Sequence, residues 1–149
     1  MRIREIKEND YRELMELYTH LHDRGIINPL PEEDENVAML WKRILDDRDY
    51  HILVAEEDGR IVSSCTCIVI PNLTRGQRPY AFVENVVTHP DFRKRGLASA
   101  CLAQAKVLAE KEGCYKMMLL TGSKEESTLH FYEAAGYNRR DKTAFIRWL

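Results

Sequence analysis

The sequence predicts a single α/β domain in which helices pack on a mixed, mostly antiparallel β-sheet. Residues 51–56 and 60–70 are β-type runs on either side of Asp58-Gly59, a pair that suits a tight hairpin turn and therefore antiparallel strands. Residues 116–121 are apolar on both faces, which suits a strand in parallel pairing that helices cover. Helical periodicity between such runs gives the order β-α-α-β-β-β-α-β-α-β over residues 1–149.

Length and charge exclude several classes of protein. The chain has 149 residues, 44% of them hydrophobic, which is enough for one packed core. Its 22 Lys and Arg against 24 Asp and Glu leave a net charge of -2, so no overall attraction draws it to nucleic acid or an anionic membrane. No apolar run approaches the roughly 18 residues of a membrane span, and the first residues lack the apolar part of a signal peptide. We expect a soluble, cytoplasmic protein with no nucleic-acid or membrane partner.

The N-terminal part of the chain is predicted to open with a short extended segment at residues 2–6 and a helix. Asp10 and Glu13 have the spacing of a capping box, which begins a helix. Apolar residues then follow the helical period from Tyr11 to Leu21. The residues expected to stop this helix are Gly25, Asn28 and Pro29.

Five further elements complete the predicted domain around the hairpin. A second helix begins near Pro31 and carries one apolar stripe. After the hairpin come a strand at residues 80–88 and helices at 97–112 and 124–135, each helix followed by a glycine that suits a C-terminal stop. Residues 143–149 alternate in the manner of a closing strand.

The cysteines and histidines indicate no metal site. The four cysteines match no zinc spacing and are too few for a disulfide framework, so buried free thiols are expected, with a nucleophilic cysteine as the alternative. Cys65 and Cys67 flank Thr66 in an extended run, which points both thiols to one face of the sheet as core residues. The five histidines form no ligand cluster.

The turn after residues 80–88 is the strongest candidate for a binding site. The first turn of a helix leaves about four backbone N–H groups unpaired and carries partial positive charge, so it attracts phosphate. Gly96 lets a ligand approach the backbone closely, and Ala98 is too small to block it. Arg93, Lys94 and Arg95 add positive charge there. A solvated basic turn is the alternative, and neither glycine pattern of the common nucleotide-binding loops is present.

Together these residues resemble the GCN5-related N-acetyltransferase (GNAT) family, whose members transfer the acetyl group of acetyl-CoA to an amine. The family pattern Q/R-x-x-G-x-G/A appears as Arg93-Lys94-Arg95-Gly96-Leu97-Ala98. Glu84-Asn85-Val86-Val87-Thr88 precedes it, and Phe131-Tyr132-Glu133-Ala134-Ala135-Gly136-Tyr137 follows at the right distance. The resemblance covers nearly the whole chain in element order and favours the bacterial-type branch that acts on small molecules.

The resemblance implies the acyl-CoA N-acyltransferase fold, a three-layer α+β arrangement. Its strands at residues 80–88 and 116–121 run parallel and splay apart at their C-terminal ends. Acetyl-CoA would lie in that gap as cosubstrate, without a metal. Backbone groups at the end of the first strand would pair with the pantetheine amides, and the following turn would hold the pyrophosphate. The implied binding residues are Val86, Val87, Thr88, Arg93, Lys94, Arg95, Gly96, Leu97, Ala98, Ser99 and Thr128.

Acetyl transfer also needs acid and base groups, because a protonated amine is not a nucleophile. Glu84 is the candidate base, since it lies in an almost apolar stretch where desolvation raises a carboxyl pKa; a carboxylate paired with Arg or Lys is the alternative. The resemblance implies that the Val86 N–H stabilises the oxyanion and that Tyr132 protonates the departing thiolate. The alternative for Tyr132 is a hydrogen bond that only positions the thioester sulfur.

The acceptor amine is less well determined than the chemistry. Parts of the chain resemble the glucosamine-6-phosphate N-acetyltransferase branch, but Leu120 and Asn85 stand where that branch has acidic residues. Many relatives have an Asn early in the last helix, where this chain has Glu125, with Thr128 as a partial substitute. The basic residues that suggest an anionic acceptor, a weak hypothesis beside ordinary surface charge, are Arg24, Arg75 and Arg78.

We therefore expect an N-acetyltransferase that acts on a primary amine of a small molecule by direct attack on the thioester. Acetylation of a protein Lys or N-terminus on the same scaffold is one alternative. A catalytically idle domain that binds acetyl-CoA as a sensor is another, and the presence of both Glu84 and Tyr132 speaks against it. Dimers are frequent among the relatives, so a homodimer stays open.

Overall fold

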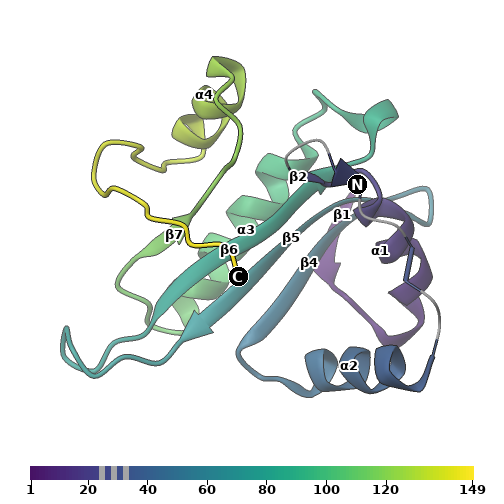
Figure 1. Ribbon diagram of the computed structural model, residues 1–149, viewed down its shortest axis with the longest axis horizontal. Helices are drawn as coiled ribbons and strands as arrows, with labels where there is room; N and C mark the ends of the chain where they lie inside the picture. Colours follow the sequence, from purple (N-terminus) through teal and green to yellow (C-terminus); the bar gives the residue numbers. More distant parts are fainter. Residues whose placement is uncertain (24–25, 28–29, 32–33) are drawn as a thin grey trace.

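The computed structural model describes residues 1–23, 26–27, 30–31 and 34–149, and it consists of both strands and helices (Figure 1). The strands are β1 (Arg2–Glu5), β2 (His22–Asp23), β3 (Ile26–Ile27), β4 (Tyr50–Glu57), β5 (Arg60–Ile70), β6 (Tyr80–Thr88) and β7 (Met117–Leu119). The helices are α1 (Tyr11–Tyr18), α2 (Glu35–Asp46), α3 (Leu97–Lys111) and α4 (Glu126–Ala134), with 3₁₀ turns η1 (Glu8–Asp10) and η2 (Pro90–Phe92).

The main sheet is mixed, as the sequence predicts. Five strands lie in the order β1-β4-β5-β6-β7, and β2 pairs with β3 in a separate hairpin. Neighbours in the main sheet are antiparallel except for β6 and β7, which are parallel. Asp58 and Gly59 both have positive φ, 50° and 75°, so the β4–β5 turn has the left-handed backbone that an Asp-Gly pair favours.

Two hydrophobic cores cover the two faces of this sheet. On one face α3 packs against the sheet through Leu97, Cys101, Leu102 and Ala105, with Tyr132 of α4 at the margin. On the other face Leu14 and Leu17 of α1 and Trp41 of α2 pack over β4 and β5. Figure 1 shows α1 and α2 together on the β4 side of the molecule and α4 beyond β7. The result is the three-layer α+β arrangement.

The thiols are core residues, as expected. Cys65 and Cys67 are fully buried on the α3 face, and Cys101 packs in the same cluster. Burial raises the pKa of Cys67 to about 12, so this thiol stays protonated at neutral pH. A protonated, buried thiol is a poor nucleophile, which argues against the cysteine alternative.

The start of α1 corrects the predicted capping box. Asp10 makes no side-chain cap bond to the helix; it accepts hydrogen bonds from Arg4 Nη1 at 2.6 Å and from the Lys7 backbone N–H at 2.7 Å. Arg4 also donates from Nε to Glu56 at 2.7 Å, so one guanidinium joins β1, η1 and β4. A half-buried guanidinium offers more binding energy to Asp10 than a helix N-terminus does.

Other predicted boundaries also move. α1 ends at Tyr18 rather than continuing to Leu21, and the Thr19 hydroxyl donates to the Glu16 carbonyl at 2.7 Å in competition with the helix. The expected stop residues Gly25, Asn28 and Pro29 lie outside the described residues. α2 begins only at Glu35, where the Asp34 carboxylate accepts from the Val37 N–H at 2.9 Å.

The predicted closing strand is wrong for the single chain. Residues 143–149 form no strand and are exposed throughout. The alternation in this segment is real, but a strand exists only when a neighbouring backbone pairs with it. The two sheets of the described chain include none of these residues.

Removal of the Asp10 charge is expected to destabilise the fold in a pH-dependent way. Although burial opposes ionisation, hydrogen bonds from Arg4 and Lys7 hold the pKa of Asp10 below its ordinary value of 3.8. A lowered native pKa means that the stabilisation is present above this ordinary value and disappears as the pH falls through the native pKa. Asp10→Asn should lower the free energy of unfolding by about 2 kcal/mol at pH 7.

Urea unfolding of both proteins at pH 7 and at acid pH measures this difference. The matched control is Asp46→Asn, because the ion pair of Asp46 with Lys42 is exposed and should contribute less than about 1 kcal/mol. An equal loss of stability in both variants at pH 7 would contradict the role of the Arg4 network.

Candidate active site

The parallel pair β6–β7 separates before β6 ends. β7 pairs with β6 only from Ala81–Met117 to Val83–Leu119, while β6 continues to Thr88. Residues 84–88 therefore have no strand of the described chain beside them on the β7 side. We call these five residues the open edge. Such an edge accepts an extended ligand by backbone pairing.

A bulge changes the backbone within the open edge. Across the β5–β6 ladder Ser64 faces Val87 and Thr66 faces Glu84, so the single residue Cys65 lies opposite two residues, Asn85 and Val86. Asn85 has a φ of 51°, a left-handed conformation that Asn tolerates better than most side chains. The bulge therefore explains the choice of Asn at position 85. Neither Asn85 nor Val86 has a register partner in β5.

The basic turn after β6 leads directly into α3. Lys94 and Gly96 both have positive φ, 60° and 77°, and Gly96 is the N-cap of the helix. The first backbone bond of α3 runs from the Ala100 N–H to the Gly96 carbonyl at 2.9 Å. In the described parts of the chain no N–H from Lys94 to Ser99 donates to another backbone carbonyl. The turn therefore presents a row of N–H donors at a helix N-terminus, which is a seat for phosphate.

The basic side chains of the turn have different partners. Arg93 Nε donates to the Thr88 carbonyl at 3.3 Å, and Arg95 forms an ion pair with Glu57 at 2.7 Å while stacking on the Phe92 ring. These contacts fasten the turn to the ends of β4 and β6. Lys94 makes no ion pair within residues that the structure describes, so its charge is available to a ligand.

Glu84 lies half-buried on the open edge, on the face that α1 covers. Its register partner Thr66 points the same way, and Val83 beside it faces α3. Desolvation raises the pKa of Glu84 above its ordinary 4.5, and its bond with the Asn85 backbone only partly offsets this. No Lys or Arg in the described residues forms an ion pair with it, which argues against the paired-carboxylate alternative.

Tyr132 lies on α4, and its ring packs on the α3-face core, 4.9 Å from the Phe131 ring and 6.4 Å from the Tyr137 ring. Burial, then the charges of Cys65 and Glu84, raise its pKa above 10.0, so the phenol is protonated at neutral pH. Glu84, on the other face of the sheet, acts on Tyr132 through its charge. Thr128, on the first turn of α4, is half-buried.

Sequence reasoning missed a group of hydroxyls next to Glu84. Ser64 and Thr66 of β5 are fully buried and face the Tyr18 hydroxyl of α1; burial raises the pKa of Tyr18, and its hydrogen bonds with Thr66 and Ser64 partly offset this. Thr66 is the cross-strand neighbour of Glu84, and the charge of that carboxylate adds to burial in raising the pKa of Tyr50. The signal in the sequence was the three hydroxyl residues Ser63, Ser64 and Thr66 in the otherwise apolar run 61–70.

The basic residues that suggested an anionic acceptor lie elsewhere. Arg78 donates to the carbonyls of Gly113 and Cys114 at 3.0 Å, and Arg75 stacks 5.7 Å from the centre of the Tyr115 ring. Both belong to the loop before Tyr80, at the opposite end of β6 from the open edge. Arg24 lies outside the described residues. The structure does not bring Arg75 and Arg78 to the site.

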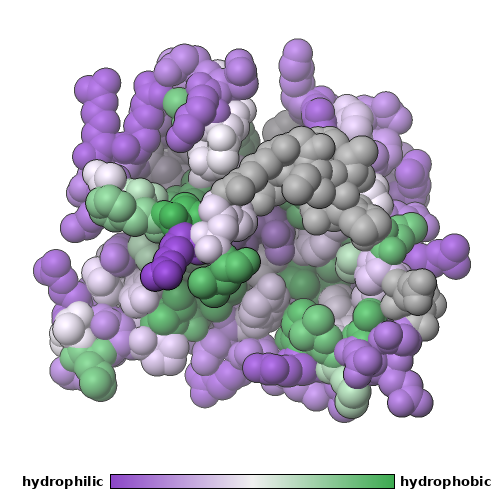
Figure 2. All heavy atoms as spheres, viewed as in Figure 1, coloured by the Kyte–Doolittle hydropathy of each residue, from purple (hydrophilic) through white to green (hydrophobic). Residues whose placement is uncertain are grey.

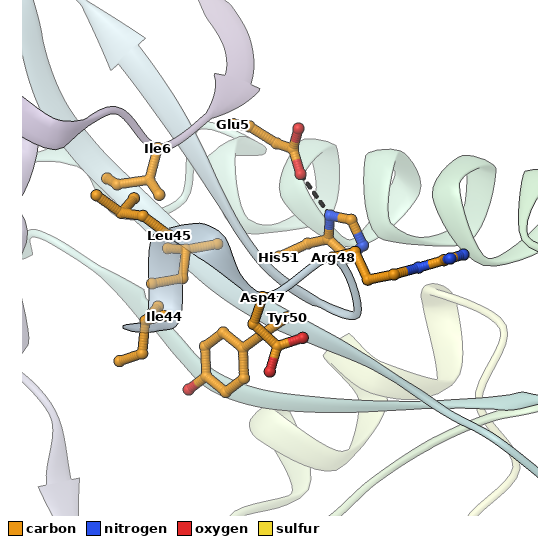
Figure 3. A pocket seen from close by; sticks show the side chains of 9 residues that line it. Glu5, Ile6, Ile44, Leu45, Asp47, Arg48, Tyr50 and His51 are labelled. Carbon is orange, nitrogen blue, oxygen red and sulfur yellow. Dashed lines mark hydrogen bonds and ion pairs between the residues drawn. The ribbon is translucent and has the colours of Figure 1, made fainter. Parts of the chain in front are cut away.

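A hollow of about 230 Å³ lies away from the predicted site residues, between the end of α2 and β4 (Figure 3). His51 and Glu5 are joined across its rim by a bond of 2.5 Å, and Tyr50 and Asp47 line the side next to α2. None of the predicted binding or catalytic residues lines it.

The described residues contain neither a metal-binding cluster nor a membrane-spanning helix. No group of three or more His, Cys, Asp or Glu is arranged to hold a metal ion there. No helix in that part of the chain is long and apolar enough to cross a membrane.

Comparison with known proteins places the chain in a family. Residues 9–137 match the acetyltransferase (GNAT) family. The chain is a GNAT acetyltransferase. It is 28% identical over 142 residues to the glucosamine 6-phosphate N-acetyltransferase of Trypanosoma brucei brucei, covering 95% of this chain and 92% of that protein.

Solved structures agree with this family and its fold. A protein of Agrobacterium tumefaciens strain C58 with a provisional acetyltransferase assignment has a TM-score of 0.88 and 35% identity, over 99% of this chain and 100% of that one. An aminoglycoside N-acetyltransferase solved in complex with CoA shares the fold, with a TM-score of 0.73 and 18% identity, over 99% of both chains. GNAT neighbours of this chain therefore include a CoA-binding enzyme.

Replacing Glu84 should raise the free energy of unfolding at neutral pH. A carboxyl whose native pKa is raised binds its proton more tightly in the folded state, so the free energy of unfolding falls as the pH rises from 4.5 through the native pKa. Glu84→Gln removes this decrease and should raise the melting temperature at pH 7, with little change near pH 4. Thermal unfolding across this pH range measures the effect, and a lower melting temperature for the variant at pH 7 would contradict it.

Proposed function

We propose that the chain transfers the acetyl group of acetyl-CoA to a primary amine of a small molecule by direct attack of the amine on the thioester. The observation that carries this proposal is the open edge of β6, which leads into the row of N–H groups without backbone partners in the described chain before α3. Glu84 lies on this edge, and Tyr132 comes from α4. In this proposal they supply the base and the acid that the reaction needs.

Glu84 acts as the base in this proposal. An amine enters the site as an ammonium ion and must lose a proton before its lone pair can attack the carbonyl carbon. The partly desolvated carboxylate has a raised pKa and is therefore a better proton acceptor than an exposed one. It takes the proton either directly or through a water molecule. The N–H of Val86, which has no partner in either neighbouring strand, donates to the thioester oxygen as negative charge develops.

Tyr132 acts as the acid. When the carbon–sulfur bond breaks, the electron pair stays on sulfur and the CoA thiolate needs a proton. The phenol of Tyr132 carries one at neutral pH because its pKa is raised. Its ring is held on two sides by Phe131 and Tyr137, which limits its motion. A hydrogen bond to sulfur without proton transfer is the alternative that mutagenesis tests.

Acetyl-CoA fits the two features that precede α3. The pantetheine amides extend the sheet along Val86, Val87 and Thr88, which have no β7 residue beside them. The pyrophosphate rests on the N–H groups from Lys94 to Ser99, and the Lys94 side chain adds positive charge. Arg93 and Arg95 serve mainly by holding the turn in place. Thr128, on the first turn of α4, is a further candidate to contact the cofactor.

The small-molecule acceptor is supported by the relatives, of which one is named for glucosamine 6-phosphate and another for aminoglycosides. Acetylation of a protein amine remains the second candidate on the same scaffold, although no observation favours it. An idle acetyl-CoA sensor needs only the turn, so it does not account for the presence of both Glu84 and Tyr132.

Tyr132→Phe tests the acid. The variant keeps the ring packing but has no proton to give, so kcat should fall by about a hundredfold. Binding of acetyl-CoA, measured by calorimetry, should change by less than about twofold because the open edge and the turn are intact. Thiol release with the best amine from a screen is the activity assay.

The matched control is Tyr137→Phe, because Tyr137 lies in the same aromatic group and also has a raised pKa. This variant should retain its activity. If Tyr132→Phe turns over at the native rate, Tyr132 does not donate the proton.

Gly96→Ala tests the phosphate seat. A Cβ at a φ of 77° costs about 1 kcal/mol of backbone strain, and it shifts the N–H groups that face the pyrophosphate. We expect acetyl-CoA to bind about tenfold more weakly. Gly76→Ala is the control, since Gly76 has a φ of 69° and equally open surroundings but lies in the loop before β6. Equal weakening of binding in both variants would contradict the assignment of the turn.

A further inference from the structure

Four hydroxyl-bearing side chains, which we call the hydroxyl cluster, lie beside Glu84 on the face of the sheet that α1 covers. Ser64 and Thr66 of β5 are fully buried there. Tyr18, at the end of α1, and Tyr50, at the start of β4, pack on the same face among apolar residues. Figure 1 draws α3 behind the sheet, so Figure 2 views this face; hydrophilic side chains form most of its rim, and apolar ones lie nearer its middle. A buried hydroxyl costs free energy unless it is hydrogen-bonded, so these side chains are not ordinary core residues.

Thr66 links the hydroxyl cluster to Glu84. The register of the sheet places Thr66 between Ile52 of β4 and Glu84 of β6, and the three side chains point to the same face. Residues directly opposite each other on antiparallel strands have Cβ atoms about 5 Å apart. The Thr66 hydroxyl and the Glu84 carboxyl group are therefore side-chain neighbours across the two strands.

The direction of the hydrogen bonds follows from a count of donors and acceptors. Burial raises the pKa of Tyr18 and of Tyr50, and Thr66 offsets part of each increase through a hydrogen bond. Both phenols are therefore protonated at neutral pH. A threonine hydroxyl has two acceptor lone pairs and one proton. When both phenols donate to Thr66, its lone pairs are filled, and its own proton is left for the acceptor on the next strand, the Glu84 carboxylate.

We propose that Thr66 is a positioning residue for Glu84: with Tyr18 and Tyr50 donating to it, its hydroxyl turns its proton toward the carboxylate and favours the ionised form. This inference rests on the proposed role of Glu84 as the base, because only the ionised carboxylate accepts a proton from the amine.

A neutral donor suits this task better than a cation. Desolvation without any donor would leave the Glu84 carboxyl group protonated, and therefore idle, over more of the neutral pH range. A Lys or Arg beside it would lower its pKa too far for an effective base and would repel the ammonium ion of the acceptor. The hydroxyl cluster stabilises the carboxylate and carries no charge of its own.

The other groups of the described chain that act on Glu84 are neutral at pH 7. Desolvation raises its pKa, and a hydrogen bond with the Asn85 backbone opposes this. The phenols whose pKa its charge raises are Tyr50 of β4 and Tyr132 of α4. No Lys or Arg of the described residues forms an ion pair with it. A change in its titration after replacement of Thr66 therefore reports on the hydroxyl.

Thr66→Val and Thr66→Ser form the decisive pair of variants. Val has the shape of Thr without the hydroxyl, and Ser keeps the hydroxyl without the methyl group. The readout is kcat/KM against pH for the best amine from a screen, since its acid limb reports the ionisation of the base in the free enzyme. The acid limb should move up by about one pH unit in Thr66→Val and by much less in Thr66→Ser. A packing role gives the opposite order of damage, because only Ser leaves a cavity.

Tyr18→Phe tests the cluster from α1. It keeps the ring but removes the phenol proton, so the acid limb should move in the same direction as in Thr66→Val, by about half a pH unit. Tyr11→Phe is the matched control, because Tyr11 lies at the other end of α1, where its ring contacts Trp41 with centroids 5.4 Å apart. This variant should keep the native acid limb. An equal shift in the two variants would contradict the proposal.

NMR titration of the Glu84 carboxyl carbon, assigned by its loss in Glu84→Gln, follows the same ionisation without acetyl-CoA or an amine. It separates this inference from the proposed function. If the chain acetylates no amine but Glu84 titrates at higher pH in Thr66→Val than in the native protein, the hydroxyl cluster acts as proposed and the role of Glu84 as the base fails. An unchanged titration of Glu84 in Thr66→Val, or an equally large shift in Thr66→Ser, would overturn the proposal.

Discussion

The architecture of the site depends on one mismatch in strand length. β7 pairs with β6 for three residues and stops, while β6 runs on to Thr88. Glu84, the Val86 N–H and the backbone proposed to pair with pantetheine lie along the part of β6 that has no β7 residue beside it. The other side of this segment is well secured, because the Ser63 hydroxyl donates to the Val87 carbonyl at 2.8 Å and the His89 N–H donates to the Val62 carbonyl at 2.9 Å. These bonds hold the end of β6 on β5 although its other edge is open.

Unusual backbone conformations gather around the same segment. Asn85 in the bulge, and Lys94 and Gly96 in the turn, have positive φ, and they lie on either side of the end of β6. Such conformations are tolerated only where surrounding contacts enforce them. The ion pair of Arg95 with Glu57, and the ring of Phe92 beneath it, supply such contacts for the turn. These backbone conformations leave N–H groups pointing outward. A phosphate or a thioester oxygen can accept hydrogen bonds from such groups.

Local signals in the sequence were enough to predict much of this. Asp58-Gly59 predicted the hairpin, and the β-branched run predicted β6 with its observed ends, Tyr80 and Thr88. The helix that follows Gly96 begins where the glycine indicated. The errors came where a distant partner decides. Asp10 has the spacing of a cap, but Arg4 binds its carboxylate. Residues 143–149 alternate like a strand but form none in the described structure.

The element order, the basic turn before α3 and the residue types that acetyl transfer requires follow from the sequence alone, because they depend on neighbours a few positions away. The packing of the whole chain sets the surroundings of each group. It packs Tyr132 of α4 on the α3-face core, puts Thr66 of β5 opposite Glu84 and holds Arg78 at the far end of β6. The physical reason is that desolvation and charge act through space, so a raised pKa depends on what the fold packs around a group.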